Sequence, residues 1–248
     1  MGGPRRCRRR RARRGRVVII YGRNAVREAL RAGRRPVQEV WATKRVSGED
    51  WLRGVKVQLA DGGQIEQRAE APDHQGIAAR VGAYPYADPN ALLRKESPFL
   101  VALDELQDVQ NLGAIIRTAE TAGADGVVIC ERRAAEVTPA VCKASAGAVE
   151  HLPVARVGNL ADFLIRAKER NVWCYGAAGE ARTAYTDVDW RGGVCIVLGA
   201  EGKGLRRRVA ETCDDLVFLP MQGKIESLNV SATGAILLYT ALQARLRP

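Results

Sequence analysis

The second half of the chain alternates between short apolar runs and helical patterns, and this alternation constrains the possible folds more than any other feature of the sequence. Apolar runs typical of buried strands lie at residues 99–103, 126–130, 154–157, 172–176, 194–198 and 216–219. Helical patterns lie at residues 111–122, 138–144, 160–169 and 227–246. Continuous apolar strands that alternate with helices are typical of a parallel sheet covered on both faces. We therefore expect an α/β domain over residues 98–248.

A smaller α/β module is expected before this domain, over residues 17–82. Strand patterns lie at residues 17–21, 37–42, 55–59 and 76–81, and a helical pattern lies at residues 24–31. Residues 83–97 are mostly polar or small and include Pro85 and Pro89. We expect a linker there, with one short helix at residues 90–95.

The net charge of +11 is concentrated at the start of the chain. Residues 1–16 hold nine arginines and no acidic residue, whereas residues 97–248 hold 17 basic and 18 acidic side chains. A block of like charges does not fold alone, and polyanions such as RNA are its natural partners. We expect a disordered tail over residues 1–16 that attracts RNA; a solvated extension without a specific role is the alternative. A smaller basic cluster lies at residues 206–208.

The sequence predicts neither a membrane segment nor a metal site. It has no run of about 18 apolar residues. None of the six cysteines is spaced as a zinc-ligand pair, and the two histidines lie far apart in the sequence. Cys130, Cys174 and Cys195 lie in apolar strand patterns, which is typical of small core residues in a reducing cytoplasm. We therefore expect a cytoplasmic protein without a bound metal.

A polar loop follows the first apolar run of the larger domain. It contains Asp104 and Asp108, and we expect a helix to begin near Asn111, which is a good N-cap residue. Ligands of parallel α/β sheets bind beyond the carboxyl ends of the strands, where this loop lies. Arg117 would project from the second turn of the helix, beside a buried apolar stripe. An ordinary surface or salt-bridged arginine is the alternative interpretation.

Two further segments have the character of ligand loops. One holds Gly199, Gly202 and Gly204 after a buried strand; it matches neither G-x-G-x-x-G nor the Walker pattern, which favours a neutral or zwitterionic cofactor over a nucleotide phosphate. The other leads to Ser227, the expected N-cap of the last helix, which opens with several poor helix formers that include Asn229. A role as N-cap explains Ser227 but not the other polar residues at the start of this helix.

Taken together, the three segments resemble the three motifs of the SpoU (TrmH/RlmB) family of RNA 2′-O-methyltransferases. The resemblance covers residues 99–246, and the preceding module, with its segments at 20–26 and 74–77, is similar to the RNA-binding domain of the RlmB-like branch. It implies a trefoil-knotted parallel-sheet (SPOUT-type) domain with S-adenosylmethionine held in the knot, preceded by an L30e-like RNA-binding domain. It also implies a homodimer with the active site near the dimer interface.

The resemblance assigns roles by position. The reactive set is Asn111, Arg117, Glu201, Ser227 and Asn229. Residues expected at the cofactor are Leu198, Gly199, Leu219, Met221 and Leu228. Those expected at RNA are Arg23 and His74, with Arg8, Arg9, Arg10 and Arg11 of the tail. One departure is Val109, which stands where the family usually has proline.

The implied reaction is transfer of a methyl group from S-adenosylmethionine to a ribose 2′-hydroxyl, most closely that of a guanosine in 23S large-subunit rRNA. Arg117 would remove the proton or stabilise the alkoxide electrostatically. A tRNA 2′-O-methyltransferase and an antibiotic-resistance rRNA methyltransferase are alternatives within this class. A non-catalytic RNA-binding factor is an alternative from another class, whereas a dehydrogenase would need the missing glycine fingerprint.

Overall fold

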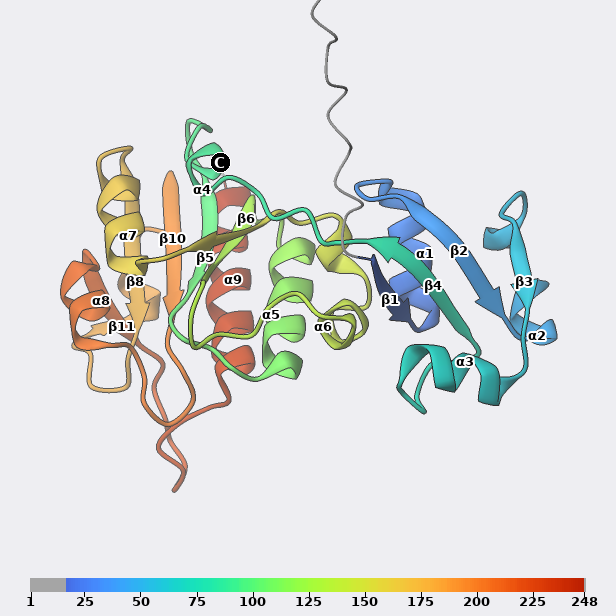
Figure 1. Cartoon of the computed structure of the whole chain (residues 1–248). Helices are drawn as coiled ribbons and strands as arrows, with labels where there is room; N and C mark the ends of the chain where they lie inside the picture. Colours follow the sequence, from blue (N-terminus) through green and yellow to red (C-terminus); the bar gives the residue numbers. More distant parts are fainter. Residues whose placement is uncertain (1–16, 248) are drawn as a thin grey trace, which may run out of the picture.

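The computed structural model describes residues 17–247 and comprises two packed α/β units (Figure 1). The first unit has a four-stranded sheet in the order β1-β4-β2-β3. Its strands are β1 (Val17–Tyr21), β2 (Val37–Ala42), β3 (Val57–Leu59) and β4 (Ile77–Gly82). Its helices are α1 (Arg23–Ala32), α2 (Lys44–Ser47) and α3 (Gly62–Ala69), with a short 3-10 turn η1 (Asp50–Leu52). We call this unit the first module.

Helices α1 and α3 cover opposite faces of the first sheet. The apolar face of α1 packs Val26 and Ala29 against Ile20 and Val40. On the other face, Ile65 of α3 packs near Trp41. The sequence does not indicate α3, because its eight residues bury one side chain only and no apolar stripe is visible.

The second unit has a seven-stranded sheet in the order β7-β6-β5-β10-β8-β11-β9, and every strand pair in it is parallel. The strands are β5 (Phe99–Leu103), β6 (Gly126–Cys130), β7 (Val154–Val157), β8 (Val172–Ala177), β9 (Thr183–Ala184), β10 (Gly193–Leu198) and β11 (Asp215–Phe218). The helices are α5 (Val109–Thr121), α6 (Pro139–Ala144), α7 (Leu160–Lys168), α8 (Arg207–Thr212) and α9 (Val230–Leu246), with 3-10 turns η2 (Ala148–Glu150) and η3 (Tyr185–Asp187). We call this unit the second domain.

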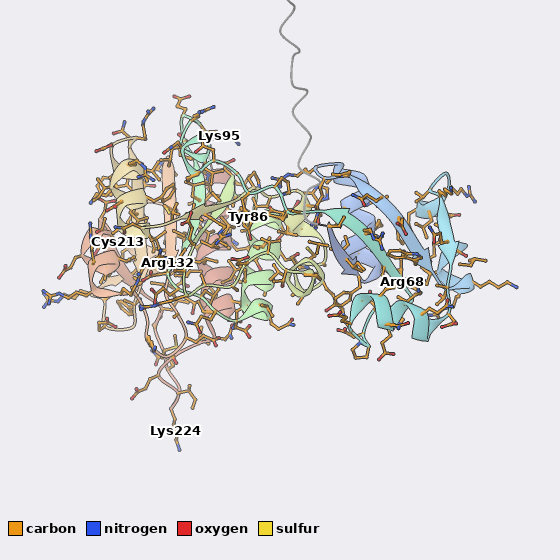
Figure 2. The ribbon with its side chains drawn as sticks, viewed as in Figure 1. Arg68, Tyr86, Lys95, Arg132, Cys213 and Lys224 are labelled. Carbon is orange, nitrogen blue, oxygen red and sulfur yellow. The ribbon has the colours of Figure 1, made fainter. Side chains whose placement is uncertain are left out.

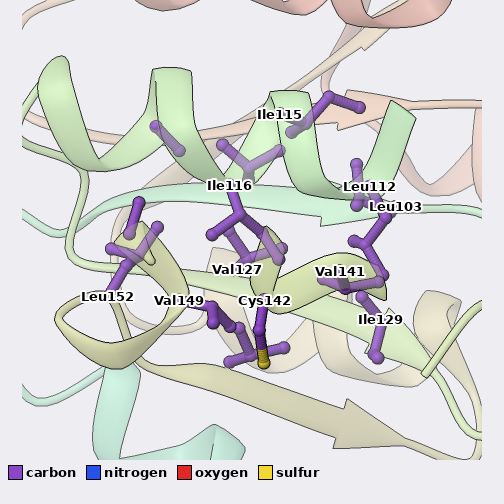
Figure 3. Close-up of a cluster of buried hydrophobic side chains, with 14 of the residues drawn as sticks. Leu103, Leu112, Ile115, Ile116, Val127, Ile129, Val141, Cys142, Val149 and Leu152 are labelled. Carbon is purple, nitrogen blue, oxygen red and sulfur yellow. The ribbon is translucent and has the colours of Figure 1, made fainter. Parts of the chain in front are cut away.

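Helices cover both faces of the second sheet, as the alternation predicts. Along β5, Val101 and Leu103 point into a cluster with α5 and α9, whereas Leu100 and Ala102 point into a cluster with α7 and α8. Figure 3 shows part of the first of these clusters, where Ile116 of α5 points toward Val127 of β6. The predicted parallel α/β fold is therefore confirmed; the trefoil knot stays a prediction.

The two units share one continuous core. Helix α6 packs against β1, and buried residues of both units belong to the same apolar cluster. The hydroxyl of Tyr84 donates to the backbone carbonyl of Val149 at 3.1 Å. Arg35 and Glu150 form an ion pair across the junction, with side chains 3% and 1% exposed. The connecting segment, which contains α4 (Pro89–Leu92), packs on the second domain: the backbone N–H of Ala87 donates to the carbonyl of Val154 at 2.8 Å.

Two predicted helix starts are wrong. Helix α5 begins at Val109, because the carboxylate of Asp108 accepts from the backbone N–H of Asn111 at 2.7 Å and is the true N-cap. Val109 thus occupies the first helical position, which proline also favours. Helix α9 begins at Val230 and is capped by Asn229, so Ser227 lies outside it. In both cases several good capping residues stand together, and the sequence does not reveal which one caps.

No helix within residues 17–247 is long and apolar enough to cross a membrane. The arginines expected to bind RNA at positions 8–11 lie outside the described residues.

Candidate active site

Three loops meet beyond the carboxyl ends of the strands of the second sheet. They follow β5, β10 and β11, and the last two line a cavity of 1120 Å³. All five residues predicted at the cofactor, Leu198, Gly199, Leu219, Met221 and Leu228, line it. Figure 2 shows Lys224 at the far tip of the loop after β11. The cavity therefore lies where parallel α/β sheets bind their ligands.

The loop after β10 folds back on itself. The backbone N–H of Ala200 donates to the carbonyl of Gly204 at 3.1 Å, and that of Gly204 donates to the carbonyl of Ala200 at 2.9 Å. Gly202 and Gly204 have φ of 72° and 64°, which is the left-handed region that glycine adopts readily. A Cβ on Gly199 would lie 2.2 Å from the carbonyl carbon of Gly204. The two ends of this loop can approach only because residue 199 has no side chain.

Replacing Gly199 with alanine should therefore destabilise the protein by about 1–3 kcal/mol, because the new methyl group must displace the backbone around residue 204. Urea denaturation of the full chain measures the loss. The matched control is Gly179→Ala, since Gly179 lines the same cavity but an added Cβ would meet nothing within 4 Å. Equal stability of the two variants would contradict the prediction.

Glu201 joins all three loops. Its Oε1 accepts from Nδ2 of Asn111 at 2.6 Å and from Nδ2 of Asn229 at 2.8 Å. Asn229 also caps α9, since its Oδ1 accepts from the backbone N–H of Ser231 at 2.8 Å. Three of the five predicted reactive residues are thus in direct contact. The Glu201 carboxylate holds the loop after β10, the loop after β11 and the start of α5 in fixed positions relative to each other.

An ion pair also holds the end of the loop after β10. The buried carboxylate of Asp104 accepts from both the backbone N–H and Nε of Arg206 at 2.8 Å, and Glu105 pairs with the same guanidinium at 2.9 Å. The hydrogen bond to Asp104 raises the pKa of Arg206. The sequence indicates Asp104 as part of a ligand loop but not its role, because no local pattern indicates a partner 102 residues away.

The basic cluster at residues 206–208 is largely neutralised within the chain. Arg206 is held by Asp104, Arg207 pairs with Glu211 at 2.7 Å, and Arg208 pairs with Asp162 at 2.9 Å. Each guanidinium thus has an intramolecular partner, which leaves little free charge to attract RNA.

The wall formed by residues 219–229 has free backbone groups and exposed apolar side chains. Between residues 221 and 228, no backbone N–H donates a hydrogen bond to another described residue. Met221, Ile225 and Leu228 are 37%, 75% and 44% exposed. Ser227 lines the same wall and its hydroxyl makes no hydrogen bond to residues 17–247. This combination suits a ligand that has both an apolar ring and polar edges.

Arg117 lies apart from this cluster. It is exposed on α5, about 9 Å along the helix axis from Asn111. It lines a different hollow of 320 Å³ between α5, η2 and α1 of the first module, and no residue lines both this hollow and the cavity. Its guanidinium forms no ion pair with any residue from 17 to 247. We call this space the inter-module hollow.

The two residues of the first module predicted to bind RNA lie together at the end of its sheet. The backbone N–H of Arg23 donates to Oε1 of Gln75 at 2.9 Å, and its guanidinium pairs with Glu49 at 2.8 Å. Nδ1 of His74 accepts from the backbone N–H of Gly76 at 3.0 Å. Nε of Arg23 also donates to the backbone carbonyl of Gln75 at 3.5 Å, so both side chains contact the turn between α3 and β4.

Within the described part of the chain, His, Cys, Asp and Glu side chains form no group of three or more able to hold a metal. The five cysteines from Cys130 onward carry free thiols. Burial raises the pKa of the Cys142 thiol to about 11, so that thiol stays neutral at physiological pH.

Comparison with known proteins covers nearly the whole described chain. Residues 98–239 match the model of the SpoU rRNA Methylase family, and residues 19–87 match the model described as RNA 2′-O ribose methyltransferase substrate binding. A Bacillus subtilis protein assigned to the TrmH family of tRNA/rRNA methyltransferases, YacO, is 40% identical over 238 residues, which span 91% of this chain and 95% of that protein.

Two solved structures are similar throughout. An AdoMet-bound rRNA methyltransferase from Sinorhizobium meliloti has a TM-score of 0.78 and 26% identity, covering 94% of this chain and 89% of that chain. An RNA 2′-O ribose methyltransferase has a TM-score of 0.80 and 25% identity, covering 94% of this chain and 90% of that chain. Both the first module and the second domain thus have counterparts in single solved proteins.

Proposed function

The chain belongs to the SpoU rRNA methylase family, and we propose on this premise that it methylates the ribose 2′-oxygen of a guanosine in 23S large-subunit rRNA. Its reaction class is that of the family: it is an S-adenosylmethionine-dependent RNA 2′-O-ribose methyltransferase. The observation that carries the proposal is the Glu201 contact to Asn111 and Asn229, which assembles the family's three motifs beside one cavity.

The choice of rRNA rests on two similarities. The family model is described for rRNA, and the Sinorhizobium meliloti neighbour is an rRNA methyltransferase. The name of the Bacillus subtilis relative covers both tRNA and rRNA, so methylation of tRNA is the second candidate.

The cavity fits S-adenosylmethionine. Exposed Met221, Ile225 and Leu228 offer apolar surface to an adenine ring, and free backbone N–H groups at residues 221–228 offer donors to its polar edges. Gly199 lets the backbone of Gly204 pack against it, which gives the loop along the cavity its shape. When bound, the sulfonium supplies an activated methyl group, so the task left to this chain is alignment and removal of the hydroxyl proton.

The reactive set divides into positioning and electrostatic roles. Asn111, Glu201 and Asn229 fix the loops around the cavity, and the free hydroxyl of Ser227 faces into it. We assign to Arg117 the stabilisation of the developing 2′-alkoxide, because a guanidinium, with its pKa above about 12, is a poor proton acceptor. An unpaired guanidinium is well suited to this role.

We propose that the active site is completed in a homodimer. Arg117 lines the inter-module hollow and not the cavity of its own chain, which supports a site where the cavity of a second copy meets Arg117. Ile236 and Tyr239 of α9 expose apolar surface beside α5, and the hydroxyl of Tyr239 lies 3.4 Å from that of Thr121. Burial of this surface against a second copy would be favourable.

RNA is proposed to contact the first module near Arg23 and His74, and the arginine-rich tail, including Arg8 to Arg11, would add salt-sensitive affinity. Free thiols on the described cysteines suit a protein that works in the cytoplasm.

Mapping of 2′-O-methyl groups in RNA from cells with and without the gene tests the substrate. The expected result is loss of one methylated guanosine in 23S rRNA and its restoration by the wild-type gene. Loss of a tRNA methyl group would select the second candidate. Unchanged methylation in every RNA, together with no methyl transfer by the purified protein, would contradict the proposed function.

A further inference from the structure

One residue, Asp104, contacts both ends of the loop after β10. It is the first residue beyond β5, and β5 pairs in parallel with β10, so that Leu103 lies opposite Leu198. The backbone N–H of Asp104 donates to the carbonyl of Leu198 at 2.8 Å. Leu198 is the last residue of β10 and lines the cavity. Asp104 is therefore bonded to the point where the loop leaves the sheet.

The side chain of Asp104 holds the other end of the same loop. Its Oδ2 accepts from the backbone N–H of Arg206 at 2.8 Å, and its Oδ1 lies 2.8 Å from Nε and 2.6 Å from Nη2 of that guanidinium. Arg206 is the N-cap residue of α8, so the loop ends there. The loop at residues 199–205 therefore begins and ends at bonds to one aspartate.

Between these two ends, the loop carries Glu201. Two reciprocal backbone hydrogen bonds close the middle of the loop and set the turn that contains this residue. Glu201 is itself exposed, so its carboxylate is placed by the loop backbone and by its bonds to Asn111 and Asn229, not by packing. The position of Glu201 therefore depends on where the loop begins and ends, and both points are bonded to Asp104.

Packing alone does not explain a carboxylate at position 104. The side chain of Asp104 is 0% exposed, whereas that of Arg206 is 46% exposed. Burying a charged group is costly unless the group is paired and hydrogen-bonded, and two apolar side chains of similar volume would fill the same space without that cost. An apolar pair cannot, however, accept a hydrogen bond from the backbone N–H of Arg206. The carboxylate thus supplies a directed bond that fixes the end of the loop.

Glu105 and Cys130 complete the surroundings of the Arg206 guanidinium. Oε1 of Glu105 accepts from its Nη1 at 2.9 Å, and Sγ of Cys130 lies 3.7 Å from its Nη2. Burial raises the pKa of the Cys130 thiol, so that thiol stays neutral at physiological pH. Both anionic partners of Arg206 therefore belong to the loop after β5, which leads to Asn111, and the loops after β5 and β10 are held as one unit.

We propose that Asp104 is a positioning residue for methyl transfer. Through its bonds to Leu198 and Arg206 it fixes the loop after β10, and that loop places Glu201 and the adjoining cavity wall against S-adenosylmethionine. Asp104 does not line the cavity, so it acts through the loop and not by contact with the cofactor. The proposal rests on the proposed function and adds a residue outside the reactive set.

Hydrogen exchange of the free protein tests the effect on the loop directly. In Asp104→Ala, the amides of Gly204 and Arg206 should exchange about tenfold faster relative to the amides of β5, because the loss of a hydrogen bond to a charged group has an effect of about this size. Asp104→Asn should show a smaller increase, since its amide oxygen can still accept from the backbone N–H of Arg206.

Asp214→Ala is the matched control. Asp214 also accepts from a backbone N–H, that of Cys174 at 2.8 Å, and pairs with a basic side chain, that of Lys168 at 3.1 Å, but it does not line the cavity. This variant loses the same kinds of contact elsewhere in the second domain. It should therefore lower the stability of the protein without changing the relative exchange of the loop amides or the affinity for S-adenosylmethionine.

Calorimetry and steady-state kinetics test the effect on function. Asp104→Ala should raise the Kd for S-adenosylmethionine and lower kcat by about tenfold each, because a misplacement of about 1 Å costs up to about 100-fold. The KM for deproteinised total RNA from cells that lack the gene should not change. If Asp104→Ala does not fold, Arg206→Ala provides the same test, because it removes the guanidinium contacts through a side chain that is 46% exposed.

The outcomes separate positioning from a merely structural contact. Variants at position 104 or 206 that lose stability but keep the wild-type exchange of the loop amides and the wild-type Kd for S-adenosylmethionine would overturn the proposal. Recovery of both quantities in the order alanine, asparagine, aspartate at position 104 would support it. Absence of methyl transfer to RNA by the wild type, with normal binding of S-adenosylmethionine, would instead contradict the proposed function.

Discussion

Replacing Arg117 with alanine should lower kcat about 10²–10³-fold and leave the affinity for S-adenosylmethionine unchanged. A group that stabilises developing charge in the transition state typically contributes a factor of this size. Arg117 does not line the cavity, so the cofactor should bind as before. The side chain is exposed and unpaired within residues 17–247, so its removal should change the free energy of unfolding by less than about 0.5 kcal/mol.

Single-turnover methyl transfer and calorimetry with S-adenosylmethionine measure these two effects separately. Arg170→Ala is a suitable control, because Arg170 is an exposed arginine that forms no ion pair with residues 17–247 and does not line the hollow. Near-wild-type turnover by Arg117→Ala would remove Arg117 from the mechanism.

The strands of the second domain were predictable because burial on both faces leaves a continuous apolar run. Phe99–Leu103 and Gly126–Cys130 are found with the bounds that the sequence indicates. Helix starts were less predictable, because Asp108 and Asn111 are both good N-caps and only the backbone geometry decides between them. Short α8 was missed because its one buried residue, Val209, produces no periodicity.

The candidate site was predictable in its parts and not in its assembly. The sequence indicates Glu201 and Asn229 as polar residues near strand ends, but their contact joins loops 28 residues apart. The Glu28–His151 contact spans 123 residues and two units, and neither residue belongs to a recognisable local motif. Contacts of this range follow from the order of strands in the sheet and from the packing of the first module, which local patterns do not encode.

The other large effect is expected at the junction between the two units. Glu150→Ala should reduce the free energy of unfolding by about 3–5 kcal/mol, because it leaves the guanidinium of Arg35 buried without its counter-charge. Nε of Arg35 lies 3.2 Å from Oε2 of Glu150, and the neighbouring Cys142 cannot replace the carboxylate, because its thiol has a pKa raised to about 11 by burial. Urea denaturation with both far-UV and tryptophan signals measures the loss.

The double variant Arg35→Met with Glu150→Leu distinguishes a missing charge from a missing contact. Replacing both members of a buried ion pair with apolar side chains is often neutral or stabilising, so this variant should regain most of the lost stability. If Glu150→Ala lowers the free energy of unfolding by less than about 1 kcal/mol, water reaches Arg35 and the junction between the two units opens easily. Because the same junction sets the distance between α1 and η2, such opening would also separate Glu28 from His151.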